Sequence, residues 1–240
     1  MPTSVWPTAD MTASRGRAAG MPRDDYFVAW SALHGGYDPR ESFFARWWLS
    51  IAHACARPLV RAGFSPNAVT VMGLLVSVLS LWPAAAGGRW ILLVPVIVVV
   101  SGLLDNLDGA VAVMTGRTSR WGYVLDSVVD RVSDTIYLVV LWLIGAPVWA
   151  CVVGGGLMML QEYARARAVA AGMSEIGVVT VWERPTRVVV TVMFVLGAGI
   201  YLSAAATWAA VGAYAWVGLG VVGCVQLLVV VRRRLIVDEM

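Results

Sequence analysis

The sequence predicts an all-α integral membrane protein with six transmembrane helices, preceded by an amphipathic helix at the membrane interface. Hydrophobic residues make up 59% of the 240-residue chain and charged residues 14%, whereas charged residues form about 25% of a soluble domain. The apolar residues also gather into six stretches, each about long enough to cross roughly 30 Å of hydrocarbon as a helix. These stretches lie near residues 68–87, 90–113, 122–144, 147–170, 187–205 and 208–231.

Two segments precede the first apolar stretch. Residues 1–24 are polar and contain no apolar run of the kind found in signal peptides, so we expect residues 1–39 to form a disordered cytosolic tail. In residues 40–62, aromatic and aliphatic residues recur at helical spacing between arginines, a pattern typical of a helix lying in the membrane interface. The six-helix domain then covers residues 63–234, and residues 235–240 form a C-terminal tail.

The distribution of arginine predicts the orientation in the membrane. With six spans, both termini and the loops at 114–121 and 171–186 lie on one side, and that side has nearly all arginines outside the spans. The loops on the other side contain only Arg89. Because cytoplasmic loops are enriched in Lys and Arg, the termini are expected in the cytoplasm. A composition rich in Ala, Gly, Val and Trp, with arginine and no lysine, is typical of a GC-rich bacterial genome, so we expect the cell membrane of a bacterium.

The cysteines and histidines predict no metal or disulfide site of their own. Cys55, Cys151 and Cys224 are odd in number, far apart and without a CxxC pair, so we expect them to be apolar packing residues. His34 and His53 precede the first span without metal-ligand spacing, and we expect both at the surface.

Five aspartates fall within the apolar stretch 101–134, where a carboxylate needs a partner. They are Asp105, Asp108, Asp126, Asp130 and Asp134. The first two are three residues apart and the next two are four apart, so each pair shares one helix face. A short connection makes the two helices antiparallel neighbours, and four carboxylates can then converge. They would repel each other unless cations lay between them.

Oxygen ligands of this kind favour Mg²⁺, Mn²⁺ or Ca²⁺ over zinc. Two Mg²⁺ ions would neutralise the four carboxylates and keep open positions for phosphate oxygens. Gly109 directly follows Asp108, and a glycine there permits close approach of a ligand to the backbone; ordinary helix packing at Gly109 and Gly122 is the alternative. Intramembrane ion pairs are the alternative for the aspartates.

Two ion pairs are predicted from sequence proximity alone. Asp134 lies three residues from Arg131, and Glu183 is next to Arg184. We expect the first to be a simple pair on one helix and the second to shape the loop before the fifth span.

The aspartates and glycines together resemble the signature of the CDP-alcohol phosphotransferase family. The pattern is Asp105-x2-Asp108-Gly109-x2-Ala112-x9-Gly122-x3-Asp126-x3-Asp130. The segment "FSPNAVTVMGLL" (64–75) looks like the family's entry into the first span. The segments "EYARARAVAAGM", "WERPTR" and "DRVSD" look like the phosphatidylinositol phosphate synthase branch. The resemblance runs from about residue 43 to about residue 230.

The resemblance implies a metal-dependent enzyme, usually a homodimer, that transfers a phosphatidyl-type group from a CDP-linked lipid to an alcohol and releases CMP. It implies two Mg²⁺ ions (Mn²⁺ being possible) held by Asp105, Asp108, Asp126 and Asp130, with Asp130 also the general base. The residues implied to line the CDP moiety are Asn67, Ala68, Val69, Thr70, Gly109 and Ser119. The acceptor candidates are Arg165, Arg167 and Arg187, because guanidinium groups suit a phosphorylated alcohol.

Two departures from the family pattern stand out. The signature has Ala-Arg where this chain has Ala112-Val113, and Arg117 or Arg120 is a candidate to replace the missing arginine. The inositol phosphate branch carries an acceptor-site arginine in its last span, where this chain has Leu227.

The function expected from the sequence is therefore Mg²⁺-dependent phosphatidyl transfer from CDP-diacylglycerol to an alcohol. Inositol phosphate is the first candidate acceptor, and glycerol 3-phosphate is the alternative. The alternatives are a membrane prenyltransferase, a cation transporter and an inactive relative. The expected partners are the CDP-lipid, a small alcohol, the lipid bilayer and a second copy of the chain, with no nucleic acid.

Overall fold

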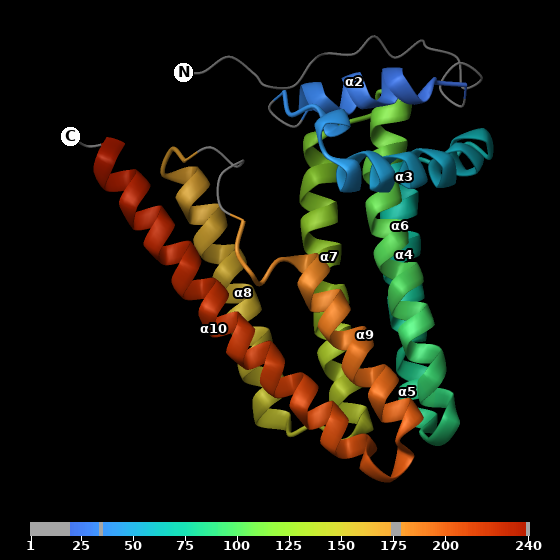
Figure 1. The fold of residues 1–240 in the computed structure, drawn as a ribbon, viewed down its shortest axis with the longest axis vertical. Coiled ribbons are helices and arrows are strands. Elements are labelled where there is room, and N and C mark those ends of the chain that lie inside the picture. Colours follow the sequence, from blue (N-terminus) through green and yellow to red (C-terminus); the bar gives the residue numbers. More distant parts are fainter. Residues whose placement is uncertain (1–19, 34–35, 174–178, 239–240) are drawn as a thin grey trace. The chain divides into compact units, whose positions relative to one another are not determined.

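The computed structural model describes residues 20–33, 36–173 and 179–238, and in these residues all regular secondary structure is helical (Figure 1). The chain divides into two compact units. The N-terminal unit comprises Met1–Gly73 and Leu103–Val129, and the C-terminal unit comprises Leu74–Gly102 and Asp130–Met240. Several long helices therefore begin in one unit and end in the other. Each unit has its own hydrophobic cluster.

The N-terminal unit begins with helix α2 (Arg23–Leu33), followed by a short 3₁₀ turn η1 (Pro39–Glu41) and helix α3 (Phe43–Arg61). Helix α2 lies within the segment 1–39 for which the sequence predicted disorder. It is helical because Tyr26 and Phe27, both 1% exposed, pack into a cluster with residues of α3 and α6. Residues 1–19 and His34 lie outside the described residues.

Helix α3 confirms that residues 40–62 contain a helix. The Ser42 hydroxyl caps its first turn by accepting a 3.4 Å hydrogen bond from the Ala45 N–H. His53 on α3 is 6% exposed, so the prediction of a surface position is wrong. Its Nε2 lies 3.0 Å from the carbonyl oxygen of Met21, and its ring lies 5.2 Å from that of Tyr26. Both contacts hold the N-terminal segment against α3.

The other helices follow in chain order. They are α4 (Pro66–Leu79), α5 (Leu81–Ala86), η2 (Gly88–Leu92), α6 (Leu93–Thr115), α7 (Arg120–Ile144), α8 (Val148–Ala170), α9 (Arg184–Ile200), η3 (Leu202–Ala204) and α10 (Ala205–Asp238). Each apolar stretch predicted from the sequence overlaps one of these long helices, with α4 and α5 sharing the first. The segment α10 extends beyond the predicted end at residue 231.

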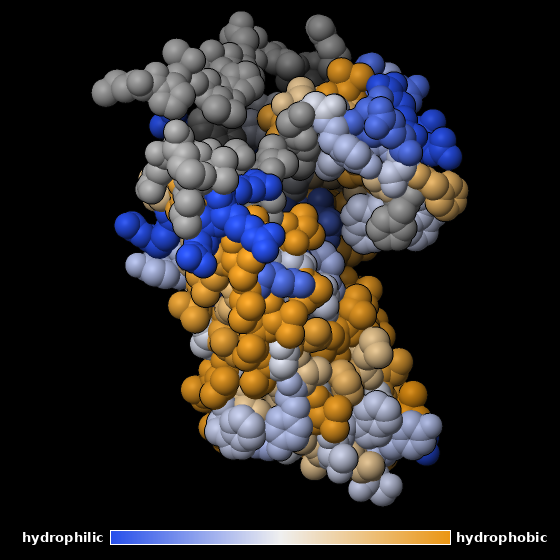
Figure 2. Space-filling model, turned by 60° about the vertical axis from the view of Figure 1, so that its left-hand side comes forward, coloured by the Kyte–Doolittle hydropathy of each residue, from blue (hydrophilic) through white to orange (hydrophobic). Residues whose placement is uncertain are grey.

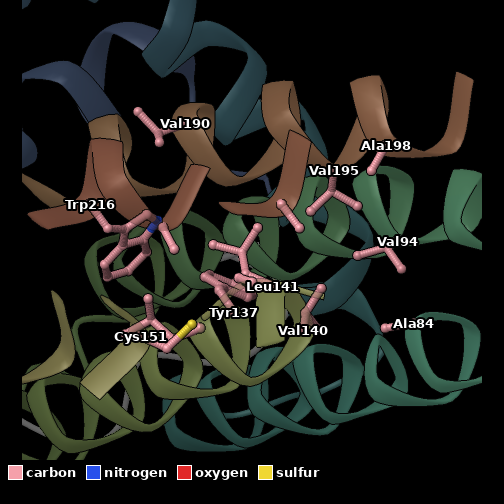
Figure 3. Packing of buried hydrophobic residues seen from close by; sticks show 14 of the residues in the cluster. Ala84, Val94, Tyr137, Val140, Leu141, Cys151, Val190, Val195, Ala198 and Trp216 are labelled. Carbon is pink, nitrogen blue, oxygen red and sulfur yellow. The ribbon is translucent and has the colours of Figure 1, made fainter. Parts of the chain in front are cut away.

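The core of the C-terminal unit is built by α7, α8, α9 and α10 together with α5, η2 and the start of α6. Tyr137, Leu141 and Trp216 are fully buried in this cluster, and Figure 3 shows Tyr137 and Leu141 of α7 together with Trp216 of α10. Helices α8 and α10 run side by side (Figure 1). Gly145 ends α7 with a φ of 128°, which suits glycine, and a Cβ there would lie 2.7 Å from Ala206 Cβ. This close contact fixes the turn between α7 and α8.

In the part of the chain that the structure describes, three helical segments are long and apolar enough to cross a membrane: Pro66–Ala86, Gly88–Thr115 and Leu202–Leu235. The outward faces of α8 and α10 are also hydrophobic, with exposed residues such as Val152, Leu160, Val221 and Leu228. Figure 2 shows apolar side chains covering much of the face that is drawn. An apolar surface of this extent is unusual for a soluble monomer and is typical of contact with lipid. The chain is therefore a helical membrane protein.

Candidate active site

A pocket of about 180 Å³ in the N-terminal unit collects most residues of the sequence motif. It is formed by the first turns of α4, the end of α6, the connection between α6 and α7, and the first two turns of α7. Its lining residues are Pro66, Asn67, Thr70, Asp108, Gly109, Ala112, Arg117, Thr118, Ser119, Gly122, Tyr123 and Asp126. Residues more than 50 positions apart in the sequence thus surround one space.

Four of the six residues expected to line the CDP moiety lie in this pocket. These are Asn67, Thr70, Gly109 and Ser119. Val69 is fully buried in the hydrophobic cluster of the N-terminal unit, so its side chain serves packing, and Ala68 is not among the lining residues.

Arg117, one of the two candidates for the missing signature arginine, is also in the lining. Tyr123 and Thr118 were not predicted. Their only sequence signal was their position beside Gly122 and Ser119.

Ser119 has a structural role in addition to its place in the pocket. Its hydroxyl accepts a 2.9 Å hydrogen bond from the Gly122 N–H, which is the contact of a helix N-cap. A Cβ on Gly122 would lie 3.0 Å from Ser119 Oγ and 3.1 Å from Asn67 Oδ1. Gly122 is therefore needed for this approach of α4 to α7. Around Gly109, by contrast, a Cβ would meet no atom within 4 Å.

The aspartates of α6 and α7 meet in the N-terminal unit. Carboxylate oxygens of Asp105 and Asp126 lie within 4.8 Å of each other. Asp108 is 7% exposed, and its Oδ2 accepts a 2.5 Å hydrogen bond from the Thr70 hydroxyl. Asp130 follows Asp126 by one helical turn on α7. Several carboxylates gathered beside an open glycine form a donor set that fits a hard divalent cation.

A network of charged side chains crosses the C-terminal unit, between α7, α8 and the start of α9. Asp130 forms ion pairs with Arg184 and Arg131. Glu162 accepts from Arg131 at 2.7 Å and from Arg187 at 3.3 Å. The network connects α7 to α8 and to the start of α9, the two helices that carry the acceptor candidates.

Two sequence predictions about ion pairs need correction. Asp134 pairs with Arg187 at 3.0 Å, and both side chains are almost completely buried. Glu183 pairs with Arg165 at 2.6 Å instead of with its neighbour Arg184. Sequence proximity was a poor guide because residues 180–187 contact α7 and α8 and bring distant charges together.

The three acceptor candidates differ in their surroundings. Arg187 is 1% exposed and is engaged by Asp134 and Glu162. Arg165 is partly exposed and pairs with Glu183, whereas Arg167 is exposed.

Glu183, directly before α9, accepts hydrogen bonds from Arg165 and Thr180. Burial opposes its ionisation, but hydrogen bonds from Arg165 and from the N–H and hydroxyl of Thr180 lower the pKa of the carboxyl below its usual value. An ionised Glu183 thus holds Arg165 in place at the end of α8.

Comparison with known proteins identifies relatives of this architecture. Archaetidylinositol phosphate synthase of Pyrococcus horikoshii is 31% identical over 156 residues, 63% of this chain and 82% of the relative. Phosphatidylinositol phosphate synthase of Mycobacterium tuberculosis is 32% identical over 191 residues, 72% of this chain and 82% of the relative.

Crystal structures of the Mycobacterium tuberculosis enzyme are similar to this structure. One has CDP-DAG bound, with a TM-score of 0.63, 29% identity, and coverage of 76% of this chain and 94% of that chain. Another is a complex with manganese and citrate, also with a TM-score of 0.63 and 29% identity, covering 75% of this chain and 88% of that chain. The model of the CDP-alcohol phosphatidyltransferase family matches residues 64–231. The chain therefore belongs to the CDP-alcohol phosphatidyltransferase family.

Proposed function

We propose that this transferase moves the phosphatidyl group of CDP-diacylglycerol to a phosphorylated alcohol, inositol phosphate in the first place, and releases CMP. The observation that carries the proposal is the pocket in which Asn67, Thr70, Gly109 and Ser119 surround the carboxylates of Asp108 and Asp126. The relatives named as inositol phosphate synthases support the choice of acceptor.

In this proposal the pocket holds the CDP end of the donor. Asn67, Thr70 and Ser119 offer polar side chains for the nucleotide, and Gly109 permits close approach of the diphosphate to α6. Asp105, Asp108, Asp126 and Asp130 would hold two divalent cations, Mg²⁺ in the first place. When bound, such cations neutralise charge that develops on the transferred phosphoryl group.

The acceptor hydroxyl attacks the β-phosphorus of the donor. The bond from that phosphorus to the bridging oxygen breaks, CMP leaves, and the proton of the hydroxyl passes to the carboxylate of Asp130. Arg131 and Arg184 orient that carboxylate. The proposed contacts for the acceptor phosphate are Arg165, Arg167 and Arg187. Arg165 and Arg187 both form ion pairs, and Arg165 is the more accessible of these two.

Glycerol 3-phosphate is the second candidate acceptor. The specific reason is Leu227, which stands where the inositol phosphate branch has an acceptor-site arginine and is 1% exposed. A smaller phosphorylated alcohol needs fewer contacts.

We further propose six transmembrane spans, formed by α4 with α5 and by α6, α7, α8, α9 and α10. Helix α3 would then lie in the membrane interface. The arginine distribution supports a cytoplasmic position for both termini and the active site. A homodimer is proposed from the family resemblance.

The test is CMP release by the purified protein with CDP-diacylglycerol and Mg²⁺ or Mn²⁺, against inositol 1-phosphate, inositol, glycerol 3-phosphate and serine. We expect CMP release with inositol 1-phosphate. Release with glycerol 3-phosphate alone would replace the acceptor, and cation flux into liposomes without CMP release would replace the proposal by a transporter.

Asp130→Asn tests the proposed base. We expect CMP release to fall by about 10²–10⁴-fold, the usual contribution of a general base, while the purified variant stays monodisperse. Activity equal to that of the unmodified protein would remove Asp130 from the role of base.

A further inference from the structure

A second pocket, of about 420 Å³, lies in the N-terminal unit beside the first. One of its sides is aromatic and aliphatic and comes from helices that precede the family-matched residues. This side consists of Tyr26, Trp30 and Leu33 on α2 and of Trp48, Leu49 and Ala52 on α3. The lining also includes Asp105, Asn106 and Asp108 of α6 and Asp126 of α7. The pocket is therefore polar at the metal-ligand candidates and apolar at α2 and α3.

The two pockets are adjacent spaces around one segment of α6. Both are lined by Asp108, Gly109, Ala112, Thr118 and Asp126. Because nothing lies within 4 Å of a Cβ placed on Gly109, a ligand can pass over this glycine from one pocket to the other. A molecule that fills both would have a polar head in the first, anionic groups at the aspartates, and an apolar end against α2 and α3.

Helix α2 packs against α3 and α6 and forms a wall of the second pocket. Tyr26 and Phe27 are each 1% exposed, and the contact of His53 with the Met21 carbonyl oxygen holds the start of the segment. Burial also raises the pKa of the Tyr26 phenol to about 12.

Val113 belongs to the same hydrophobic cluster as Tyr26 and Phe27 and is 9% exposed. An arginine at position 113, as in the family signature, would bring a charge into this cluster at a cost in free energy. The apolar residue at position 113, where the signature has arginine, is thus compatible with the packing of α2 against α6.

We propose that α2 and α3 form the binding site for the lipid portion of the donor next to its diphosphate, with Trp30 and Trp48 as the contacts. The inference rests on the proposed function in taking a CDP-linked lipid as the donor. It adds a donor-binding element from outside residues 64–231. A pocket of this size, mostly apolar with a few polar groups at one end, suits the glycerol backbone and first acyl carbons.

Equilibrium binding of two ligands tests the proposal without turnover. CDP-diacylglycerol reaches both pockets, whereas CDP reaches only the first. In Trp30→Ala and Trp48→Ala, affinity for CDP-diacylglycerol should fall about tenfold, equivalent to about 1.4 kcal/mol, and affinity for CDP should not change. Equal losses for both ligands, or no loss for either, would overturn the proposal.

The chain offers matched controls on the same helices. Trp47 adjoins Trp48 but is 51% exposed, and Val28 on α2 is 57% exposed; neither lines the pocket. Trp47→Ala and Val28→Ala should bind both ligands as the unmodified protein does. Trp30→Phe should keep most of the affinity if packing against the lipid is the cause. Competition by phosphatidic acid as strong as that by CDP-diacylglycerol would indicate a general lipid site and contradict the proposal.

Steady-state kinetics separates this inference from the proposed function. If the unmodified protein binds CDP-diacylglycerol but releases no CMP with any acceptor, the proposed function fails while the binding comparison still decides the inference. If CMP is released, Trp30→Ala should raise the KM for the donor and leave the KM for the acceptor unchanged. An effect on the acceptor KM alone would assign the second pocket to the acceptor.

Val113→Arg provides an independent test. If α2 forms the wall, this variant should weaken CDP-diacylglycerol binding as Trp30→Ala does, because the new charge displaces α2. Tighter binding or faster CMP release in Val113→Arg would contradict the proposal.

Discussion

The hydroxyl of Thr70, in the second turn of α4, donates a 2.5 Å hydrogen bond to Oδ2 of Asp108 on α6. Both side chains are buried. The bond fixes the orientation of a carboxylate that we expect to bind a cation, and such outer partners of metal ligands commonly change metal affinity by 10–100-fold.

Thr70→Val should therefore weaken Mn²⁺ or Mg²⁺ binding by about tenfold or more, because Asp108 loses its orienting partner. Thr70→Ser keeps the hydroxyl and should retain most of the affinity. Metal titration of the purified variants measures the effect. Equal metal affinity in Thr70→Val and Thr70→Ser would show that the hydrogen bond serves packing alone.

Gly109 and Gly122 should respond differently to the same substitution. In Gly109→Ala the added methyl group meets no protein atom, so helix stability should rise by about 1 kcal/mol while donor affinity falls about tenfold. In Gly122→Ala the methyl group crowds Ser119 and Asn67, so both stability and affinity should fall. Thermal melts and CDP-diacylglycerol binding measure the two properties, and unchanged donor affinity in Gly109→Ala would argue against a ligand at this glycine.

The buried pair of Asp134 and Arg187 should be important for stability. Arg187→Met leaves a buried carboxylate without this partner and should lower the free energy of unfolding by about 3–5 kcal/mol. The double variant Asp134→Leu with Arg187→Met should recover much of that loss. Denaturant unfolding in detergent measures it, with the exposed Arg167→Met as a control expected within about 0.5 kcal/mol. A single variant as stable as the control would free Arg187 for a purely acceptor-binding role.

Glu183 should make the stability of the loop depend on pH. Since its pKa is lower in the folded protein than in the unfolded chain, its contribution is present above its ordinary pKa and is lost as the pH falls through the folded value. Glu183→Gln should therefore cost about 1–3 kcal/mol at neutral pH. The difference from the unmodified protein should shrink in acid. Melting curves between neutral and acidic pH measure this, and a difference independent of pH would assign the effect to packing.

The sequence was sufficient for the features that depend on local order. Apolar stretches located the helices from α4 to α10, since the length and hydrophobicity of a segment are properties of adjacent residues. The spacing of the aspartates also predicted that Asp105 and Asp126 would come close. Even so, within the described residues three segments satisfy length and hydropathy for a membrane span by themselves. Helices α7 and α8 contain several charged residues, and α9 has only 17 residues.

Only the tertiary structure decided which charges pair and what the N-terminal segment does. Asp134 pairs with Arg187, 53 positions away, because the start of α9 packs near α7. Helix α2 forms within the segment 1–39 that was predicted to be disordered, because Tyr26 and Phe27 are buried against α3 and α6. Both outcomes depend on contacts between segments distant in the sequence, which local periodicity does not encode. The sequence thus determined the helices and the family motif, and tertiary packing decided the ion pairs and the aromatic side of the second pocket.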